Sequence, residues 1–197
     1  MTIDEHVFRW INGLAGRFGP LDWAASHLAN DYFIPATIAL IAFGLWFSGN
    51  TLEARRRNQW AFIYGAVGVG FSALAVMIIN HYYFRDRPYV LFPQIIPEVK
   101  HLFYLPTVSS FPSYPAALTF AFAFGVWLRN KKVGIVLFVL SVVMGLARIY
   151  VGVHYPLDIL GGAAVGIAIT YLFFWILKLL KPIVDLFIAI LERLSLA

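Results

Sequence analysis

Long apolar stretches with almost no charge constrain the fold of this chain more than any other feature. Five of them have the composition of membrane spans, and together they contain a single charged residue, Arg148: Phe33–Phe47, Trp60–Tyr83, Ala116–Leu128, Val133–Tyr150 and Ile159–Leu177. Only 13% of all residues are charged, against about a quarter in a typical soluble domain. Because a membrane helix needs about 17–25 mainly apolar residues, the pattern predicts an all-α, polytopic membrane helical bundle of about five spans.

Both ends of the chain have an amphipathic pattern rather than that of a span. Residues 1–30 mix aromatic and charged side chains at roughly helical spacing, which predicts two short interfacial helices broken at Gly19-Pro20. Residues 183–194 follow Pro182 and have the pattern of a further amphipathic helix. No internal repeat divides the sequence, so we expect residues 1–197 to form one membrane-embedded domain.

Basic residues gather in alternate loops between the predicted spans. The three clusters are Arg55–Arg57, Arg129–Lys132 and Lys178–Lys181. The positive-inside rule places all three in the cytoplasm, so the net charge of +5 indicates membrane topology and no nucleic-acid partner is expected. The loops at 85–115 and 148–158 then lie together on the extracytoplasmic face.

The run from Arg148 to Asp158 brings three kinds of ionisable group to that face. It holds a guanidinium, the imidazole of His154 and a carboxylate between two apolar stretches. Ionisable groups at a membrane boundary are costly unless they pair or take part in chemistry. An arginine can bind phosphate, a histidine can attack or move protons, and an aspartate can orient that histidine. The trio is equally compatible with simple interfacial polarity, and these residues alone leave both interpretations open.

Two further segments of the predicted outer face carry groups suited to phosphate. Arg85 and Arg87 follow the second span, and a guanidinium fork matches phosphate oxygens, although Arg85 can also pair with Asp86 or with lipid headgroups. Ser113 lies where the third span begins, and the free N–H groups of a helix start attract anions. The sequence therefore predicts a phosphate site; it has no dense carboxylate cluster for a metal, and neither a metal nor a cofactor is expected.

The run at Arg148 resembles the third motif of the type 2 phosphatidic acid phosphatase superfamily, Ser-Arg-x5-His-x3-Asp. Arg148, His154 and Asp158 stand at the family spacing, and Ala147 replaces the serine. The order of the motifs and the pattern of spans extend the resemblance over nearly the whole chain. The chain is similar in size to bacterial undecaprenyl-diphosphatases linked to bacitracin resistance. It also shares with them a Phe-x-x-Arg-Pro segment and a Phe-Pro-Ser stretch.

The other two family motifs are matched in part. The first, Lys-x6-Arg-Pro, is matched by Arg87-Pro88, while Asn80 stands at the lysine position and Arg85 is a candidate to replace that charge. The second, Pro-Ser-Gly-His, begins at Pro112-Ser113 and continues as Tyr114-Pro115. The resemblance is therefore strongest in the third motif and weakest at the histidine of the second.

The resemblance implies a lipid phosphatase that uses no metal. His154 would attack phosphorus and form a phosphohistidine, and Asp158 would orient the imidazole and stabilise its charge. The transferring phosphoryl group would be bound by Arg87, Arg148, Arg85 and Ser113. The implied substrate is a lipid phosphate or diphosphate, and the implied location is the bacterial cytoplasmic (inner) membrane, multi-pass, with the active site on the extracytoplasmic face.

The replacement of the second-motif histidine by Pro115 bears on the substrate. In the family this histidine protonates the leaving group, and loss of a general acid typically costs about 10²–10⁴-fold in rate. A lipid phosphate that leaves from a diphosphate is a weak base and needs the proton less than an alkoxide does. The sequence therefore favours a diphosphate, and the resemblance implies that it is a polyprenyl (undecaprenyl) diphosphate. Tyr114, His101 and His81 are candidate substitute acids.

Other functions stay open at this point. Pro115 is compatible with a catalytically impaired member that binds or moves a lipid phosphate. A phosphatidate or phosphatidylglycerophosphate phosphatase, or a phosphotransferase with an acceptor other than water, would use the same residues. All of these alternatives share a lipid phosphate ligand and a membrane location, and the oligomeric state is not predicted.

Overall fold

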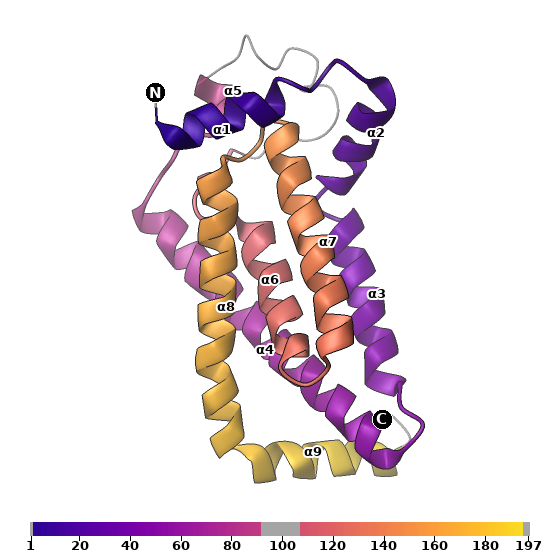
Figure 1. Ribbon diagram of the computed structural model, residues 1–197. Coiled ribbons are helices and arrows are strands. Elements are labelled where there is room, and N and C mark those ends of the chain that lie inside the picture. The colour runs from indigo at the N-terminus through magenta and orange to yellow at the C-terminus, as the bar shows by residue number, and fades with distance from the viewer. Residues whose placement is uncertain (1, 92–106, 195–197) are drawn as a thin grey trace.

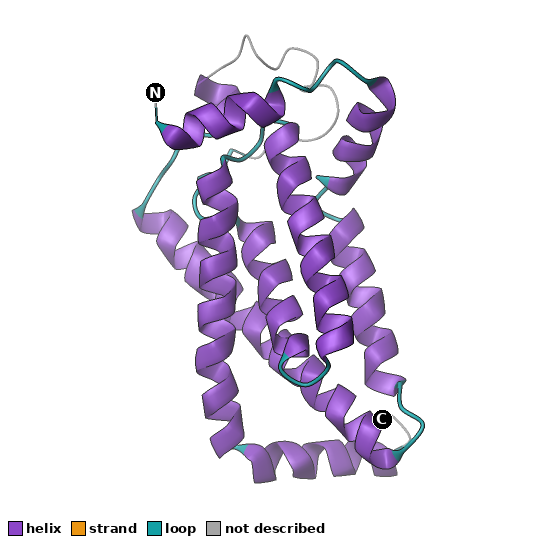
Figure 2. Ribbon diagram, in the orientation of Figure 1, coloured by secondary structure: helices purple, strands orange, loops and turns teal. Residues whose placement is uncertain are grey.

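Helices make up the regular structure of the part of the chain that the computed structural model describes, residues 2–91 and 107–194 (Figures 1 and 2). In chain order they are α1 (Ile3–Asn12), α2 (Gly19–Leu28), α3 (Phe33–Phe47), α4 (Leu52–Tyr82), α5 (Pro88–Leu91), α6 (Tyr114–Trp127), α7 (Lys131–Tyr150), α8 (Pro156–Leu179) and α9 (Lys181–Arg193). No strand occurs within these two ranges. The predicted all-α class is confirmed.

The apolar helices form a bundle around α6, which packs against α4, α7 and α8, while α3 packs against α4 and α7 (Figure 1). Small residues allow close approach within this bundle. A Cβ atom on Gly162 of α8 would lie 2.5 Å from the carbonyl oxygen of Ser113, directly before α6. A Cβ on Gly125 of α6 would lie 2.5 Å from the Cα of Gly65 in α4. The start of α6 is therefore held tightly against α8.

Among the described residues, three helices, α4, α7 and α8, are long and apolar enough to cross a membrane. The α2–α3 pair, bent by 55°, has the length and composition of a fourth span. By itself α3 has 15 residues, and α6 has 14, so both are shorter than the ~17–25 residues that a straight span needs. The prediction of a multi-pass helical membrane protein is confirmed, and the number of five spans stays a prediction.

Helix boundaries differ from the predicted ones where capping groups decide them. The second predicted span started near Trp60, but α4 begins at Leu52 because the side chain of Thr51 accepts a hydrogen bond from the N–H of Ala54. The Gly19-Pro20 pair, predicted as a break, opens α2. Likewise Pro182 lies inside the first turn of α9, where its missing N–H costs little.

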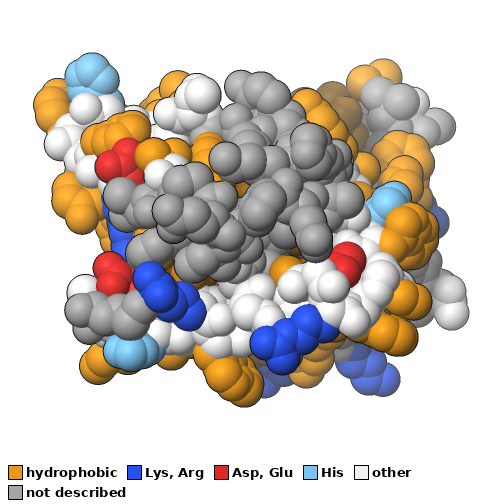
Figure 3. All heavy atoms as spheres, turned by 90° about the horizontal axis from the view of Figure 1, so that it is seen from above, with side chains coloured by type: hydrophobic (Ala, Val, Ile, Leu, Met, Phe, Trp, Pro, Cys, Tyr) orange, Lys and Arg blue, Asp and Glu red, His pale blue; other side chains and the backbone are white. Residues whose placement is uncertain are grey.

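The terminal helices α1 and α9 lie at opposite ends of the bundle (Figure 1). α9 is tied to the start of α4 by Arg56, whose Nη2 lies 2.8 Å from Glu192, and by the indole of Trp60, which donates to Asp185 at 2.8 Å. The three basic clusters of the sequence lie near this end. α1 crosses the other end, which Figure 3 shows with basic, acidic and histidine side chains around its margin.

The loops that carry the predicted site residues meet at the α1 end. They are residues 83–87 after α4, residues 107–113 before α6 and residues 151–155 between α7 and α8. They come together because α4 and α7 run towards this end, while α6 and α8 start there (Figure 1). Helix packing thus brings three distant segments into one polar cluster beneath α1.

Candidate active site

His154 lies in the turn between α7 and α8, and its side chain is only 1% exposed. Its Nδ1 lies 3.1 Å from the carbonyl oxygen of Ser110, a group that can only accept a hydrogen bond. Its Nε2 lies 3.2 Å from Nη1 of Arg87, a group that can only donate. Both contacts require the same neutral tautomer, with the proton on Nδ1 and a lone pair on Nε2. Nε2 is therefore the ring nitrogen whose lone pair is free to act as a nucleophile.

Burial lowers the pKa of His154 to about 3. The hydrogen bond with Asp158 opposes this shift, while the positive charges of Arg148 and Arg87 reinforce it. The ring is consequently neutral throughout the physiological pH range. A neutral imidazole is the form that can attack phosphorus.

Arg87 stands beside this imidazole and is itself only 6% exposed. Three backbone carbonyls hold its guanidinium: those of Val108, Val153 and Ser109, at 3.0, 3.0 and 3.2 Å. Burial, and next the charge of Arg148, lower the pKa of Arg87 to about 10, which leaves it charged at neutral pH. A fixed positive charge therefore faces the nitrogen that would receive a phosphoryl group.

Ser113 approaches the same nitrogen from the start of α6. Its Oγ lies 3.4 Å from Nε2 of His154, and its N–H donates to the carbonyl oxygen of Asp158 at 2.9 Å. Ser113 is the residue that precedes the first turn of α6, but its hydroxyl does not cap the helix. The hydroxyl and the N-terminus of α6 are thus both directed at the site, as phosphate binding needs.

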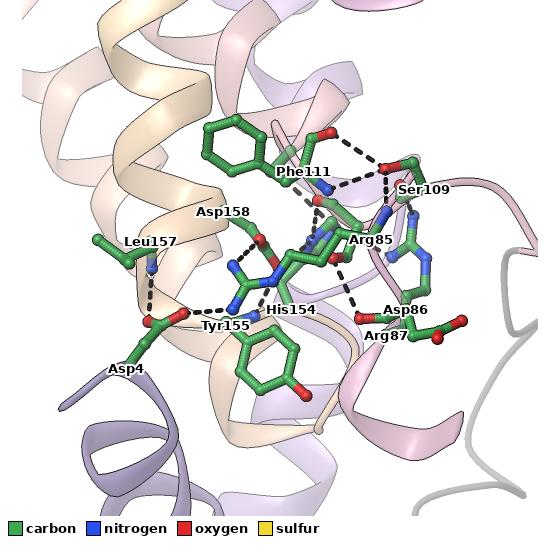
Figure 4. A network of polar contacts seen from close by, with 12 residues as sticks. Asp4, Arg85, Asp86, Arg87, Ser109, Phe111, His154, Tyr155, Leu157 and Asp158 are labelled. Atoms are coloured by element: carbon green, nitrogen blue, oxygen red, sulfur yellow. Dashed lines mark hydrogen bonds and ion pairs between the residues drawn. The ribbon is translucent and has the colours of Figure 1, made fainter. Parts of the chain in front are cut away.

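Asp158 connects the histidine to a second arginine (Figure 4). One carboxylate oxygen, Oδ2, accepts from the N–H of Tyr155 at 2.8 Å and lies 3.5 Å from Nδ1 of His154. The other, Oδ1, accepts from Nη1 of Arg85 at 2.7 Å. Asp158 is completely buried, so this pairing holds its charge directly behind the imidazole.

The two remaining arginines of the predicted site are engaged by aspartates that sequence reasoning did not single out. Nη2 of Arg85 lies 2.6 Å from Asp4 of α1. Nη1 of Arg148 lies 2.6 Å from Asp31, which is 43% exposed, and 2.8 Å from the carbonyl oxygen of Ala29. Nε of Arg148 is buried and has no hydrogen-bond partner among the described residues.

The three segments that meet at His154 also match a known family. The model of the PAP2 superfamily matches residues 60–181, which is more than half of the chain. The chain belongs to the PAP2 superfamily. The family resemblance, which the motifs had indicated, is confirmed, and so is the prediction of a phosphatase.

Known proteins of similar sequence and structure support this assignment. Undecaprenyl-diphosphatase BcrC of Bacillus subtilis is 34% identical over 98% of this chain and 93% of its own length. The crystal structure of Aquifex aeolicus LpxE superposes with a TM-score of 0.68 at 25% identity, covering 87% of this chain and 94% of that one. A PAP2-type phosphatidylglycerolphosphate phosphatase from Bacillus subtilis shares the fold, with a TM-score of 0.58 at 22% identity, over 86% of this chain and 81% of its own.

Within this PAP2 domain, Pro115 occupies a position that favours proline. It lies in the first turn of α6, where a missing N–H is tolerated. Tyr114, a candidate acid, begins the same helix and is 40% exposed. His101, a second candidate acid, lies outside the described residues, and His81, the third, is an exposed residue near the end of α4. Among the described residues, Arg87 and Ser113 place a polar group within hydrogen-bonding distance of Nε2 of His154.

Proposed function

We propose that this protein removes the terminal phosphate of a polyprenyl diphosphate, undecaprenyl diphosphate above all, and leaves the monophosphate. The observation that carries the proposal is the fixed neutral tautomer of His154, with Nε2 facing Arg87 and Ser113. A relative 34% identical over nearly the whole chain is an undecaprenyl-diphosphatase, which supports the choice of lipid.

The reaction proceeds through a phosphohistidine. Nε2 of His154 attacks the terminal phosphorus, the bridging P–O bond breaks, and the lipid monophosphate leaves with that electron pair. Water then attacks the phosphohistidine, the P–N bond breaks, and inorganic phosphate leaves while the imidazole returns to its neutral form. Asp158 lies 3.5 Å from Nδ1 and stabilises the positive charge that the ring carries in between.

The groups around Nε2 are suited to the charge of the transferring phosphoryl group. Arg87 and the hydroxyl of Ser113 lie 3.2 and 3.4 Å from that nitrogen, so they can bind the oxygens of a phosphorus that approaches it. Nε of Arg148 supplies a further donor. Because Pro115 offers no proton, a diphosphate, whose leaving group is a weak base, is the better substrate for this site.

The proposed location is the bacterial cytoplasmic (inner) membrane with the site on its extracytoplasmic face. The support is the charge pattern: the basic clusters lie at the α9 end of the bundle and the site lies at the α1 end. Under the positive-inside rule the α9 end is cytoplasmic. Residues 1–197 would form one lipid phosphatase domain in this arrangement, because α1 contributes directly to the polar cluster.

The direct test is release of inorganic phosphate by the full chain in detergent micelles. The substrates are undecaprenyl diphosphate, undecaprenyl monophosphate and phosphatidate at equal concentration. We expect release from the diphosphate in preference to both monoesters, and a loss of roughly 10³-fold or more in the variant His154→Ala. The variant His6→Ala, which alters an exposed histidine of α1, is the matched control. Release that survives His154→Ala would exclude the proposed nucleophile.

Pro115 favours one second candidate, a member that binds a lipid phosphate without turnover. It would bind undecaprenyl diphosphate in the same micelles and release no phosphate from any of the three substrates. Restoring the family residue separates the candidates, since Pro115→His would then create activity in an inactive parent. An active parent excludes this second candidate.

A further inference from the structure

We infer that Asp4, in the N-terminal helix α1, is a positioning residue for the catalytic pair of His154 and Asp158. The inference rests on the proposed function and deepens it. Figure 4 shows the path: Asp4 contacts Arg85, Arg85 contacts Asp158, and Asp158 stands behind the imidazole. Asp4 lies outside residues 60–181, the part of the chain that the PAP2 model matches.

Asp4 uses its two carboxylate oxygens for two different parts of the site. Oδ2 accepts from Nη2 of Arg85 at 2.6 Å. Oδ1 accepts from the N–H of Leu157 at 2.9 Å, in the first turn of α8. That N–H is one of the groups that a helix start leaves without an internal partner. One buried side chain therefore fixes both the helix that carries Asp158 and the arginine that pairs with it.

α1 is itself anchored to the α7–α8 turn that carries His154. The ring of Phe8 packs edge-on against that of Tyr155, with centroids 5.3 Å apart. The amide of Asn12 donates to the carbonyl oxygen of Tyr150 at 2.7 Å. A capping box between Thr2 and Glu5 fixes the start of α1 directly beside Asp4. Asp4 thus has a defined position relative to the catalytic turn.

The charges give this contact a consequence for catalysis. Arg85 lies between two carboxylates, so its single positive charge is shared by Asp4 and Asp158. Paired with Asp158 alone, it would neutralise the carboxylate that stabilises the positively charged phosphohistidine. The shared arrangement leaves a net negative charge behind His154, which favours formation of the charged intermediate.

Asp4→Asn is the test, because it removes the charge and keeps the shape of the side chain. Phosphate release from undecaprenyl diphosphate by the full chain in micelles is expected to show a kcat lowered roughly 10-fold or more, with KM within about twofold. Asp4→Glu should restore part of kcat. Glu5→Gln makes the same change of charge one residue further along α1 and keeps the capping box, because Gln can also serve at this position, so it should leave both constants unchanged.

A second measurement reports on the imidazole without requiring turnover. The ¹⁵N signals of the His154 ring are assigned by their loss in His154→Ala, and they report which nitrogen carries the proton. We expect Asp4→Asn to shift these signals and Glu5→Gln to leave them in place. This readout still decides the role of Asp4 if the wild-type protein releases no phosphate, a result that would contradict only the proposed function.

Two results would overturn the inference. One is a ring spectrum and a kcat in Asp4→Asn that match those of Glu5→Gln. The other is a loss of kcat that equals the loss of folded protein, measured by thermal unfolding, while the His154 signals stay unchanged. In the second case Asp4 would contribute to stability alone.

Discussion

Nη1 of Arg87 lies 3.2 Å from Nε2 of His154, on the side of the ring opposite its contact with Ser110. A buried cation at this distance disfavours protonation of the nitrogen and attracts an anion to the same place. The arrangement therefore keeps the imidazole neutral and places a positive charge where the proposed phosphoryl group would bind.

The side chain of His154 should remain neutral at acidic pH, down to at least pH 5. Because burial lowers the pKa of His154 to about 3, protonation of the nucleophile should not reduce kcat/KM between pH 7 and pH 5. An ordinary histidine, with a pKa near 6.5, would be mostly protonated at pH 5. The check is kcat/KM against pH, corrected for the ionisation of the substrate as measured by ³¹P NMR. A decline with a midpoint near pH 6.5 after that correction would contradict the assignment.

The same shift predicts how stability depends on pH. The pKa of His154 is lower in the folded than in the unfolded protein, so between pH 3 and pH 6.5 the unfolded chain binds more protons. This contribution to the free energy of unfolding is fully present above pH 6.5 and is lost as the pH falls towards 3. Thermal unfolding in micelles should therefore show a smaller decline over this range in His154→Gln than in the wild-type protein.

Asp31→Asn is expected to destabilise the protein, and added inorganic phosphate is expected to restore part of the lost stability. Removing one partner of a buried ion pair costs about 3–5 kcal/mol, and because Asp31 is 43% exposed we expect a smaller cost of about 1–3 kcal/mol. Inorganic phosphate can replace the lost charge at Arg148. Thermal unfolding with and without phosphate should show greater stabilisation of the variant than of the wild-type protein. Equal stabilisation of the variant and the wild-type protein by phosphate would show that Arg148 does not contribute to the phosphate site.

Pro115→His is expected to raise monoester hydrolysis more than diphosphate hydrolysis. A histidine here can protonate an alkoxide leaving group, a contribution of about 10²-fold or more, whereas the weakly basic lipid phosphate gains less. The measurement is the ratio of kcat/KM for undecaprenyl monophosphate to that for the diphosphate. Pro115→Ala, which removes the ring without adding an acid, should leave this ratio unchanged.

Gly162→Ala should disturb the start of α6. Its Cβ would lie 2.5 Å from the carbonyl oxygen of Ser113, so α6 and α8 must separate, at a cost of about 1–3 kcal/mol. Gly70→Ala is the matched control, because a Cβ there meets no atom within 4 Å. Thermal unfolding of the two variants in the same detergent checks the difference. A Gly162 variant as stable as the Gly70 variant would show that the contact is relaxed at little cost.

Much of the fold could be predicted because its determinants are local in the sequence. The apolar stretch Phe33–Phe47 is a helix with the predicted boundaries, since hydropathy alone distinguishes it from its neighbours. The start of α4 was predicted too late because a single cap at Thr51, rather than hydropathy, decides where that helix begins. The role of Ser110 could not be predicted, since it acts through its backbone carbonyl and any residue supplies that group.

That the chain is a helical membrane protein and a PAP2 phosphatase could be predicted from its apolar runs and motif spacing, because both are local patterns along the chain. The ion-pair partners of the arginines, in contrast, depend on how distant segments pack in three dimensions. Arg85 pairs with Asp4 across 81 positions of the chain, and Arg148 with Asp31 across 117. Such pairs depend on how α1, α2, α7 and α8 pack at one end of the bundle, and no local pattern records that geometry.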